Sequence, residues 1–279
     1  MESKNLEEMN IKIHPSAIVE EGATIEKDVY IGPFCYVEKS VTLKKGVFIH
    51  SNAQILGKTT LHENVKVFQF ATVGGFSNDL KYLPEEATTT EIGKNTVIKE
   101  YANIHAGTPG PTERTGSGTV VGENCVIMQY AHIGHDCKVG NRVLLSVRAT
   151  LAGEVYVDDF AIISGLAAIH QFVSIGESVI TGGCAKITQD AAPYTIIDGN
   201  PASLKGINII GLKRRGFSDD DIRILKNLYR DLFYSKKKTW KEKLEECKEK
   251  YKDNEKSKKV FDFINENRRG LAGHHNHKG

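Results

Sequence analysis

The sequence predicts a parallel β-helix followed by a small helical domain, an all-β body with an α addition. Three observations support this: an aliphatic residue recurs at every sixth position across residues 13–187, small residues follow many of these aliphatics four positions later, and the period stops after residue 187. The period has 26 positions, and only Thr181 is not Ile, Val or Leu. A chain that is 40% hydrophobic would fill about ten of them by chance, so the repeat is real.

Each six-residue unit is predicted to form one side of a three-sided coil. Helices need apolar residues near every 3.6 residues and half-buried strands at every second one, whereas hexapeptide repeats are typical of a parallel β-helix. A coil then contains about 18 residues, and nearly nine coils at about 4.8 Å each give a prism roughly 40 Å long. Small or β-branched residues should fill the interior beside the repeat aliphatics: Ala17, Ala23, Val29, Cys35, Val41, Val47, Ala53, Ala131, Cys137, Val143 and Ala149.

The period is interrupted twice, which predicts two loops, at residues 74–91 and 105–120. The six-residue spacing is broken between Val73 and Ile92, and again between Ile104 and Val121. Long excursions from a rigid scaffold often carry binding groups. The second loop is rich in Gly, Pro and Thr, and a tolerated insertion is an equal alternative for it. The first is the stronger candidate because it gathers four polar side chains: Asn78, Asp79, Lys81 and Tyr82.

After the period ends, turn residues mark a boundary between a β-helix over residues 1–192 and a helical domain over residues 193–279. These residues are Pro193, Gly199, Asn200 and Pro201. Ser218 is expected to begin a first helix because three aspartates follow it. Further helices are expected over Trp240–Tyr251 and Ser257–Asn267. The apolar stripe of the first helix should face a small core: Ile222, Leu225, Leu228, Leu232 and Phe233.

The composition indicates a cytoplasmic protein. There is no apolar signal sequence and no apolar run of about 18 residues, so no membrane insertion is expected. The five cysteines have no metal-ligand spacing, and Cys35, Cys125 and Cys137 should be buried small residues, which favours a reducing compartment. From Pro193 onward there are 21 Lys and Arg against 13 Asp and Glu. That basic end suits an acidic partner or is only a solvated face, and nothing predicts a nucleic-acid partner.

One outer edge of the prism gathers groups that can do chemistry. Ile133 and Cys137 point inward by phase, so His135 and Asp136 should lie outward near a corner. Residues 18 apart stack on adjacent coils, which aligns His135 with Gly153 and Gln171, and Asp136 with Glu154. His132 and His170 lie on the same edge, and Gly153 is expected to leave room for a ligand and a backbone N–H.

An imidazole with a neighbouring carboxylate can act as the general base that removes a hydroxyl proton during acyl transfer. Taken singly, His132, His135 or His170 could be an ordinary solvated surface histidine. Because all three lie on one edge, a functional site is an equal alternative. A cysteine nucleophile is disfavoured because Cys137 is inward. A zinc site shared between subunits is a further alternative, although the histidine spacing matches no familiar ligand pattern. A catalytically silent scaffold is the alternative from another class.

The chain resembles a known family in six segments: His135-Asp136-Cys137, Leu151-Ala152-Gly153, His170-Gln171-Phe172, Gly182-Gly183-Cys184, Gly199-Asn200 and Gly211-Leu212-Lys213-Arg214-Arg215-Gly216-Phe217. These are similar to the UDP-N-acetylglucosamine O-acyltransferases of lipid A biosynthesis, and the resemblance covers nearly the whole chain. It implies a left-handed β-helix, a homotrimer with sites between subunits and no cofactor or metal. The implied reaction moves a 3-hydroxyacyl group from acyl carrier protein to the 3-position of the UDP-amino sugar, with direct attack on the thioester.

The resemblance also implies residue roles. His135 would be the general base, Asp136 would orient it and the Gly153 N–H would stabilise the oxyanion. Gly183 would limit acyl length, and a glycine there implies a long chain. The remaining residues would contact the sugar nucleotide, its phosphates or the carrier: Asp79, Lys81, His132, His170, Gln171, Asn208, Arg214 and Arg215.

Three positions depart from the family's pattern. Glu154 stands where a histidine is usual, Asn78 where a glutamine is common and Ile210 where a glutamate can contact the nucleoside. Glu154 beside Asp136 stacks two carboxylates, which would raise one pKa or attract a cation. A substrate-binding role for Glu154 and a 3-amino sugar acceptor follow as hypotheses. The N-acyltransferase of the same pathway is disfavoured because its uridine-binding domain has no counterpart in the short segment before Ile13.

Overall fold

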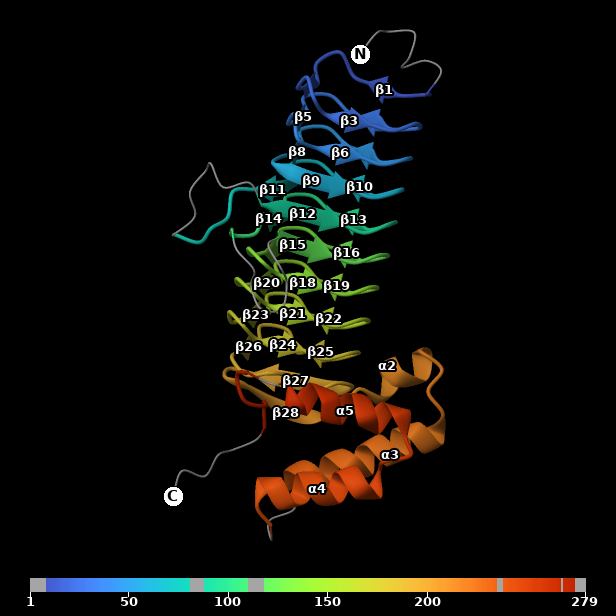
Figure 1. Cartoon of the computed structure of the whole chain (residues 1–279), viewed down its shortest axis with the longest axis vertical. Coiled ribbons are helices and arrows are strands. Elements are labelled where there is room, and N and C mark those ends of the chain that lie inside the picture. The colour runs from blue at the N-terminus through green and yellow to red at the C-terminus, as the bar shows by residue number, and fades with distance from the viewer. Residues whose placement is uncertain (1–8, 81–87, 110–117, 235–237, 267, 274–279) are drawn as a thin grey trace.

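The computed structural model describes residues 9–80, 88–109, 118–234, 238–266 and 268–273. Its long body is a prism of stacked coils, with the helices gathered at one end (Figure 1). Three sheets form the sides, with 11, 9 and 8 strands, here called sheets A, B and C. Within the coils each strand pairs in parallel with the strand at the same place in the next coil, as where Ile13 faces Ile31. The predicted β-helix is therefore confirmed.

The strands of sheet A are β1 (Lys12–Ile13), β4 (Tyr30–Ile31), β7 (Phe48–Ile49), β10 (Lys66–Val67), β13 (Val97–Ile98), β16 (Val126–Ile127), β19 (Leu144–Leu145), β22 (Ile162–Ile163), β25 (Ile180–Thr181), β27 (Thr195–Gly199) and β28 (Ala202–Ile207). Those of sheet B are β2 (Ile18–Val19), β5 (Tyr36–Val37), β8 (Gln54–Ile55), β11 (Thr72–Gly75), β14 (Asn103–His105), β17 (His132–Ile133), β20 (Thr150–Leu151), β23 (Ala168–Ile169) and β26 (Lys186–Ile187). Those of sheet C are β3 (Thr24–Ile25), β6 (Thr42–Leu43), β9 (Lys58–Leu61), β12 (Thr89–Ile92), β15 (Gly118–Val121), β18 (Lys138–Val139), β21 (Tyr156–Val157) and β24 (Ser174–Ile175).

The aliphatic repeat forms the core of the prism. Every repeat residue from Ile25 to Ile187 is at most 4% exposed, including Thr181. Ile13 and Val19 are only half-buried because none of the described residues forms a coil above the first one. Cys35, Cys125 and Cys137 are buried at 1% exposure or less, as predicted.

The three edges of the prism are tight turns that repeat once per coil. We call them the A–B, B–C and C–A corners; residues 182–184, 152–154 and 176–178 are one turn of each. Twenty described non-glycine residues have φ between 51° and 68°, most of them in these turns. A left-handed conformation costs a non-glycine residue about 1 kcal/mol, which the coil-to-coil hydrogen bonds must offset.

Both predicted loops leave at the B–C corner, but they are shorter than expected. β12 begins at Thr89 and β15 at Gly118, so the ends of both predicted ranges are strand. Their residues pair in parallel along four positions, for example Thr89 with Gly118. The departure at this one corner puts both loops on the same edge of the molecule (Figure 1).

Past residue 192 the chain does not turn directly into helices. Strands β27 and β28 form an antiparallel hairpin on the end of sheet A, with Asn200 and Pro201 at its turn. The Gly-Asn-Pro segment, which we interpreted as a boundary, is therefore a hairpin turn. The helices that follow are α2 (Ile209–Arg214), α3 (Asp219–Tyr229), the π-helical turn η1 (Arg230–Tyr234), α4 (Trp240–Lys250) and α5 (Glu255–Asn265).

The helix starts follow their capping residues. Ser218 caps α3 and accepts a hydrogen bond from the Asp221 N–H, as predicted. Thr239 caps α4 in a reciprocal capping box with Glu242. The third helix begins two residues earlier than predicted because Asn254 caps it, and the short helix α2 was not predicted. The predicted apolar stripe runs from α3 into η1, which carries its last two residues, Leu232 and Phe233, and it packs into a second core with Val260 and Phe261 of α5.

Candidate active site

The B–C corner brings together the side chains that the sequence placed on one edge. The Glu154 N–H donates to the His135 carbonyl oxygen at 2.9 Å, and the Phe172 N–H donates to the Gly153 carbonyl oxygen at 3.2 Å. The turns that carry His135, Gly153 and Gln171 therefore stack one above another. The predicted alignment of residues 18 apart is confirmed at this edge.

His135 and Asp136 form a hydrogen-bonded pair in one turn. The Asp136 Oδ2 lies 2.9 Å from the His135 Nδ1. The imidazole is 16% exposed, and the Asp136 carboxylate is fully buried. We expected both side chains to lie outward; they leave the prism core, but Asp136 is covered. A buried carboxylate that accepts the Nδ1 proton fixes the tautomer that leaves Nε2 as the basic nitrogen.

The cover over Asp136 comes from the second loop. Thr108 donates its N–H to Asp136 Oδ1 at 2.9 Å and to Oδ2 at 3.0 Å, and its hydroxyl to Oδ2 at 2.7 Å. The Asp136 N–H itself donates to the Thr119 hydroxyl oxygen at 3.0 Å. Thr108 belongs to the second predicted loop, for which a tolerated insertion without a role was the alternative. At least this part of the loop has a role, because it holds Asp136, the partner of His135.

Gly153 lies directly under the imidazole. A Cβ atom at this position would stand 2.1 Å from the His135 Nε2. We expected the missing side chain to leave room for a ligand; instead the imidazole ring fills that room. Among the described residues, none accepts a hydrogen bond from the Gly153 N–H.

The electrostatics of the corner make the imidazole of His135 more basic than an ordinary one. The hydrogen bond to Asp136 raises the pKa of His135, against the effect of burial, and the Asp79 and Glu154 carboxylates add to the increase. Burial acts to raise the pKa of Asp136, but the hydrogen bonds from His135 and Thr108 outweigh it and the pKa is lowered. Burial and then the charge of Asp136 raise the pKa of Glu154. The stacking of two carboxylates that the sequence predicted is thus the second cause of the shift, after burial.

Two more histidines and a glutamine lie beside this pair. His132 projects from β17, its ring 5.1 Å from that of His105, and burial followed by the charge of His105 lowers its pKa to about 4. His132 is therefore neutral at physiological pH. His170 and Gln171 are exposed on the turn one coil beyond Gly153, and Asp79 is close enough to act on His135.

Four other predicted site residues lie elsewhere in the single chain. Gly183 is on the A–B corner. Asn208 caps α2 and donates to the Ser178 carbonyl oxygen at the C–A corner. Arg215 is ion-paired with Glu177 at 2.7 Å on that same corner, and Arg214 is exposed at the end of α2. One chain alone therefore does not bring these four residues to His135.

The remaining predicted residue, Lys81, lies outside the described part of the chain.

Three residues that hold parts of the B–C corner in place were not predicted from the sequence. Thr108 and Thr119 form hydrogen bonds with Asp136. The only feature of the sequence that could have indicated Thr119 is its position, as a polar residue just before the aliphatic residues of a strand. The third is Asp190, which is buried and binds the end of the chain back to the prism.

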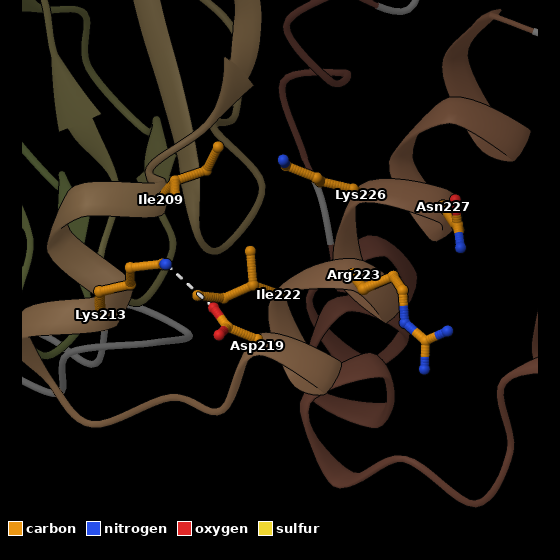
Figure 2. A pocket seen from close by; sticks show the side chains of 7 residues that line it. All are labelled: Ile209, Lys213, Asp219, Ile222, Arg223, Lys226 and Asn227. Atoms are coloured by element: carbon orange, nitrogen blue, oxygen red, sulfur yellow. Dashed lines mark ion pairs between the residues drawn. The ribbon is translucent and has the colours of Figure 1, made fainter.

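A pocket of about 240 Å³ lies in the helical region between α2 and α3. Lys213 pairs with Asp219 at 2.9 Å across its mouth. Figure 2 shows Lys226 pointing from α3 toward Ile209, whereas Arg223 points away. Three of its lining residues are basic, but Lys213 pairs with Asp219 and Arg223 with Asp220. The pocket is separate from the B–C corner.

The described residues contain no group of three or more His, Cys, Asp or Glu side chains that could hold a metal ion. Within the same residues, no helix has the length and apolar character needed to cross a bilayer.

Comparison with known proteins gives consistent matches to one group. Residues 190–272 match the family described as UDP N-acetylglucosamine O-acyltransferase, domain 2. Residues 118–153 match the bacterial transferase hexapeptide family, described as six repeats. An acyl-[acyl-carrier-protein]–UDP-N-acetylglucosamine O-acyltransferase of Campylobacter concisus is 38% identical over 260 residues, which cover 93% of this chain and 96% of the relative.

Solved structures agree with the sequence matches. The UDP-N-acetylglucosamine acyltransferase of Francisella novicida superposes with a TM-score of 0.89 at 35% identity and covers 95% of both chains. That of Campylobacter jejuni superposes with a TM-score of 0.86 at 37% identity, covering 95% of this chain and all of the other.

Proposed function

This chain belongs to the UDP-N-acetylglucosamine O-acyltransferase family, and we propose that it moves a 3-hydroxyacyl group from acyl carrier protein to the 3-position of UDP-N-acetylglucosamine, the first step of lipid A biosynthesis. The observation that carries the proposal is the His135–Asp136 pair, 2.9 Å apart, with Gly153 beneath the imidazole. Such a pair is suited to removing a proton from a hydroxyl group.

In the proposed reaction His135 is the general base. Its Nε2 accepts the proton of the sugar 3-hydroxyl while the oxygen bonds to the thioester carbonyl carbon. Asp136 holds the ring through Nδ1 and stabilises the imidazolium that forms. The tetrahedral intermediate then loses its C–S bond, and the departing thiolate takes the proton back from the imidazolium.

We assign the oxyanion of that intermediate to the Gly153 N–H. This donor has no acceptor among the described residues and lies on the turn below His135. A preorganised backbone donor is worth several kcal/mol to such an intermediate. His132, His170, Gln171, Asp79, Lys81 and Glu154 are proposed to contact the sugar nucleotide. Neutral His132 would act there as a hydrogen-bond partner rather than as a charge.

The site requires a second chain if Gly183, Asn208, Arg214 and Arg215 also belong to it, since they lie away from the B–C corner of their own chain. We propose a homotrimer in which the A–B corner of one prism, which carries Gly183, faces the B–C corner of the next. This contact accounts for Gly183 but not for Asn208 and Arg215, which lie on the C–A corner. An exposed apolar ladder runs along the A–B corner and supports this contact. Its rings stack at 5.0 Å and 4.9 Å between Phe70, Tyr101 and Tyr130, and Leu166, further along the same corner, is 55% exposed.

The oligomer is tested by Leu166→Glu, with Tyr234→Glu in the helical region as the matched control. Both residues are large, apolar and exposed, at 55% and 60%. Analytical ultracentrifugation should find trimers for the parent and control and smaller species for Leu166→Glu. An unchanged trimer would show that the ladder is not the interface.

The acyl carrier protein would approach from the helical end. Its acidic surface suits the excess of basic residues after Pro193, including the pocket formed by Lys213, Arg223 and Lys226. Gly183 has no side chain to limit the acyl chain, so we propose a long 3-hydroxyacyl group. The buried, unpaired cysteines favour the reducing conditions of the cytoplasm.

The proposal is tested by incubating the enzyme with mixed acyl carrier protein thioesters and the sugar nucleotide, and weighing the product by mass spectrometry. A long 3-hydroxyacyl ester that forms with the parent and not with His135→Ala is the expected result. If both proteins form no product while both keep their fold, a non-catalytic scaffold is the better interpretation.

The 3-amino analogue of the sugar nucleotide is the second candidate acceptor. It is favoured by Glu154, a second carboxylate next to Asp136, whose pKa is raised first by burial and then by the charge of Asp136. An ammonium group would supply positive charge there. Turnover of the 3-hydroxy and 3-amino nucleotides under the same conditions distinguishes them, and a strong preference for the hydroxyl would exclude the amine.

A further inference from the structure

The end of the described chain returns to the B–C corner. We call residues 268–273 the C-terminal strap. Asp190, which lies one coil beyond Phe172 and so occupies the next turn of this corner, pairs with Leu271 of the strap. The Asp190 N–H donates to the Gly270 carbonyl oxygen at 2.8 Å, and the Ala272 N–H donates to the Asp190 carbonyl oxygen at 2.9 Å. The strap thus lies one coil beyond the predicted substrate residues.

The buried carboxylate of Asp190 fixes the start of the strap. Its Oδ2 accepts hydrogen bonds from the Arg268 N–H at 2.8 Å and the Arg269 N–H at 3.1 Å. Its Oδ1 accepts one from the Ser174 N–H at 2.7 Å, within strand β24. Asp190 is fully buried. The backbone of both arginines is therefore held against the prism by one side chain.

The two arginine side chains reach the candidate active site. The Arg269 Nη2 lies 3.4 Å from the His170 Nδ1. The charge of Arg268 acts on Glu154, where it opposes the larger effects of burial and of Asp136 on the pKa of that carboxyl. Both side chains are exposed. The Arg269 guanidinium thus lies beside His170, and the charge of Arg268 is near enough to act on Glu154.

These charges meet a need of the corner. Asp79, Asp136 and Glu154 all act on His135 as negative charges. An anionic substrate group that approaches this edge would be repelled unless positive charge lies nearby. The guanidinium fork matches phosphate oxygens in geometry and remains charged at any physiological pH.

We propose that Arg268 and Arg269 bind a phosphate group of a substrate at the B–C corner, and that Asp190 is the residue that positions them. The inference rests on the proposed function, whose two substrates both carry phosphate: the diphosphate of the sugar nucleotide and the phosphodiester of the carrier's pantetheine arm. The strap is then a part of the substrate site rather than only an end of the fold.

The test uses Arg268→Ala, Arg269→Ala and the double variant, with Arg230→Ala as the control. Arg230 is an exposed arginine on the helical region, away from the corner. Steady-state kinetics give kcat and the KM for each substrate, calorimetry gives the affinity for UDP-N-acetylglucosamine and for free phosphopantetheine, and a thermal melt reports stability. We expect roughly a tenfold rise in one KM for each arginine removed, with kcat within threefold and an unchanged melting temperature.

The outcome also identifies the phosphate. A rise in the KM and dissociation constant for the nucleotide assigns the diphosphate, whereas a rise confined to the acyl donor and phosphopantetheine assigns the carrier's arm. If the parent turns over and the double variant matches it within twofold in both KM values, the inference is wrong. If the parent shows no turnover, the proposed function fails, and calorimetry with the same two probes still decides whether the arginines bind phosphate.

Two further variants distinguish a strap that binds phosphate from one that only stabilises the fold. Asp190→Asn replaces a carboxylate that accepts three N–H groups, two of them from the strap, with an amide. It should release the strap and reproduce the KM effect of the double variant. Arg268→Lys combined with Arg269→Lys keeps the charge and should recover part of the affinity. A structural strap would instead lower the melting temperature in every variant and leave both KM values unchanged.

Discussion

The B–C and C–A corners have the same backbone turn, but their polar side chains have different kinds of partner. At the C–A corner, Asn64, Asn95 and Asn124 have φ between 57° and 61°, close to the 56° and 58° of Asp136 and Glu154 at the B–C corner. The asparagines bond to one another up the column, at 3.1 Å and 3.2 Å. At the B–C corner the polar side chains instead take partners from a loop. The same turn therefore presents side chains at both corners, and the proposed reactivity of His135 depends on the partners that the loop supplies to Asp136.

The largest expected difference between the two corners comes from truncating one side chain on each. His135→Ala should lower turnover by about 10³-fold because general base catalysis typically contributes 10² to 10⁴. Asn95→Ala should leave turnover unchanged and cost about 1 kcal/mol of stability, since it breaks amide hydrogen bonds in the ladder. Steady-state acyl transfer and thermal melts measure both. Comparable losses of turnover in the two variants would remove the distinction.

A methyl group at Gly153 should have the next largest effect. The new Cβ would stand 2.1 Å from the His135 Nε2, so the imidazole must swing away and turnover should fall by about 10²-fold. Gly165→Ala is the matched control at the same turn position of the A–B corner, where the nearest atom is the Val147 carbonyl oxygen at 3.3 Å. We expect it to lose less than threefold. An equal loss would mean that the turns, not the imidazole, require glycine.

Asp136→Asn should shift the pH dependence of the reaction. Only neutral His135 can act as a base, and the hydrogen bond to Asp136 raises its pKa. In the parent, kcat/KM should therefore fall on the acid side with a midpoint above the ordinary value of about 6.5. Without the carboxylate that pKa drops, so the midpoint should move to lower pH while the plateau falls about tenfold. An acid limb that stays in place would mean that another group controls it.

The smallest expected effect is that of Thr108→Val, which sharpens the contribution of the loop. It removes the hydroxyl that donates to Asp136 Oδ2 at 2.7 Å and keeps the N–H. The pKa of Asp136 should rise because one hydrogen bond that lowers it is lost. We expect a loss of about 1.5 kcal/mol of stability at neutral pH and a turnover reduced by no more than a few fold.

The pH dependence of that stability difference provides a control. The folded pKa of Asp136 lies below its unfolded value, so its contribution is present above the unfolded pKa and is lost as the pH falls through the folded one. Melts of the parent and of Thr108→Val should therefore converge in acid. Curves that stay parallel to low pH would contradict a role through Asp136.

The β-helix could be predicted from the sequence because its buried aliphatic positions recur every six residues, regardless of which residues lie on the surface between them. The phase of Ile133 and Cys137 placed His135 at a corner, and the spacing of 18 aligned it with Gly153. The same spacing placed Glu154 beside Asp136, where the pKa of one carboxyl group was expected to rise; the raised one is that of Glu154.

The rest depends on contacts that no local pattern encodes. Thr108 binds Asp136, which lies 28 positions further along the chain. Asp190 binds Arg268 and Arg269, at sequence separations of 78 and 79. The hairpin of β27 and β28 was missed because Gly-Asn-Pro indicates a turn but does not reveal that a second strand comes after it. Arg215 was assigned to the nucleotide by resemblance, but in one chain it contacts Glu177.

The coil rise has a consequence for how such a site can change. Groups on one edge of the prism recur once per coil, so the separations among them come in steps of about 4.8 Å. A ligand that is longer by one methylene cannot be matched by sliding a group along the edge by a fraction of a step. Selectivity for the length of the ligand must instead come from which coil carries a bulky side chain at that edge.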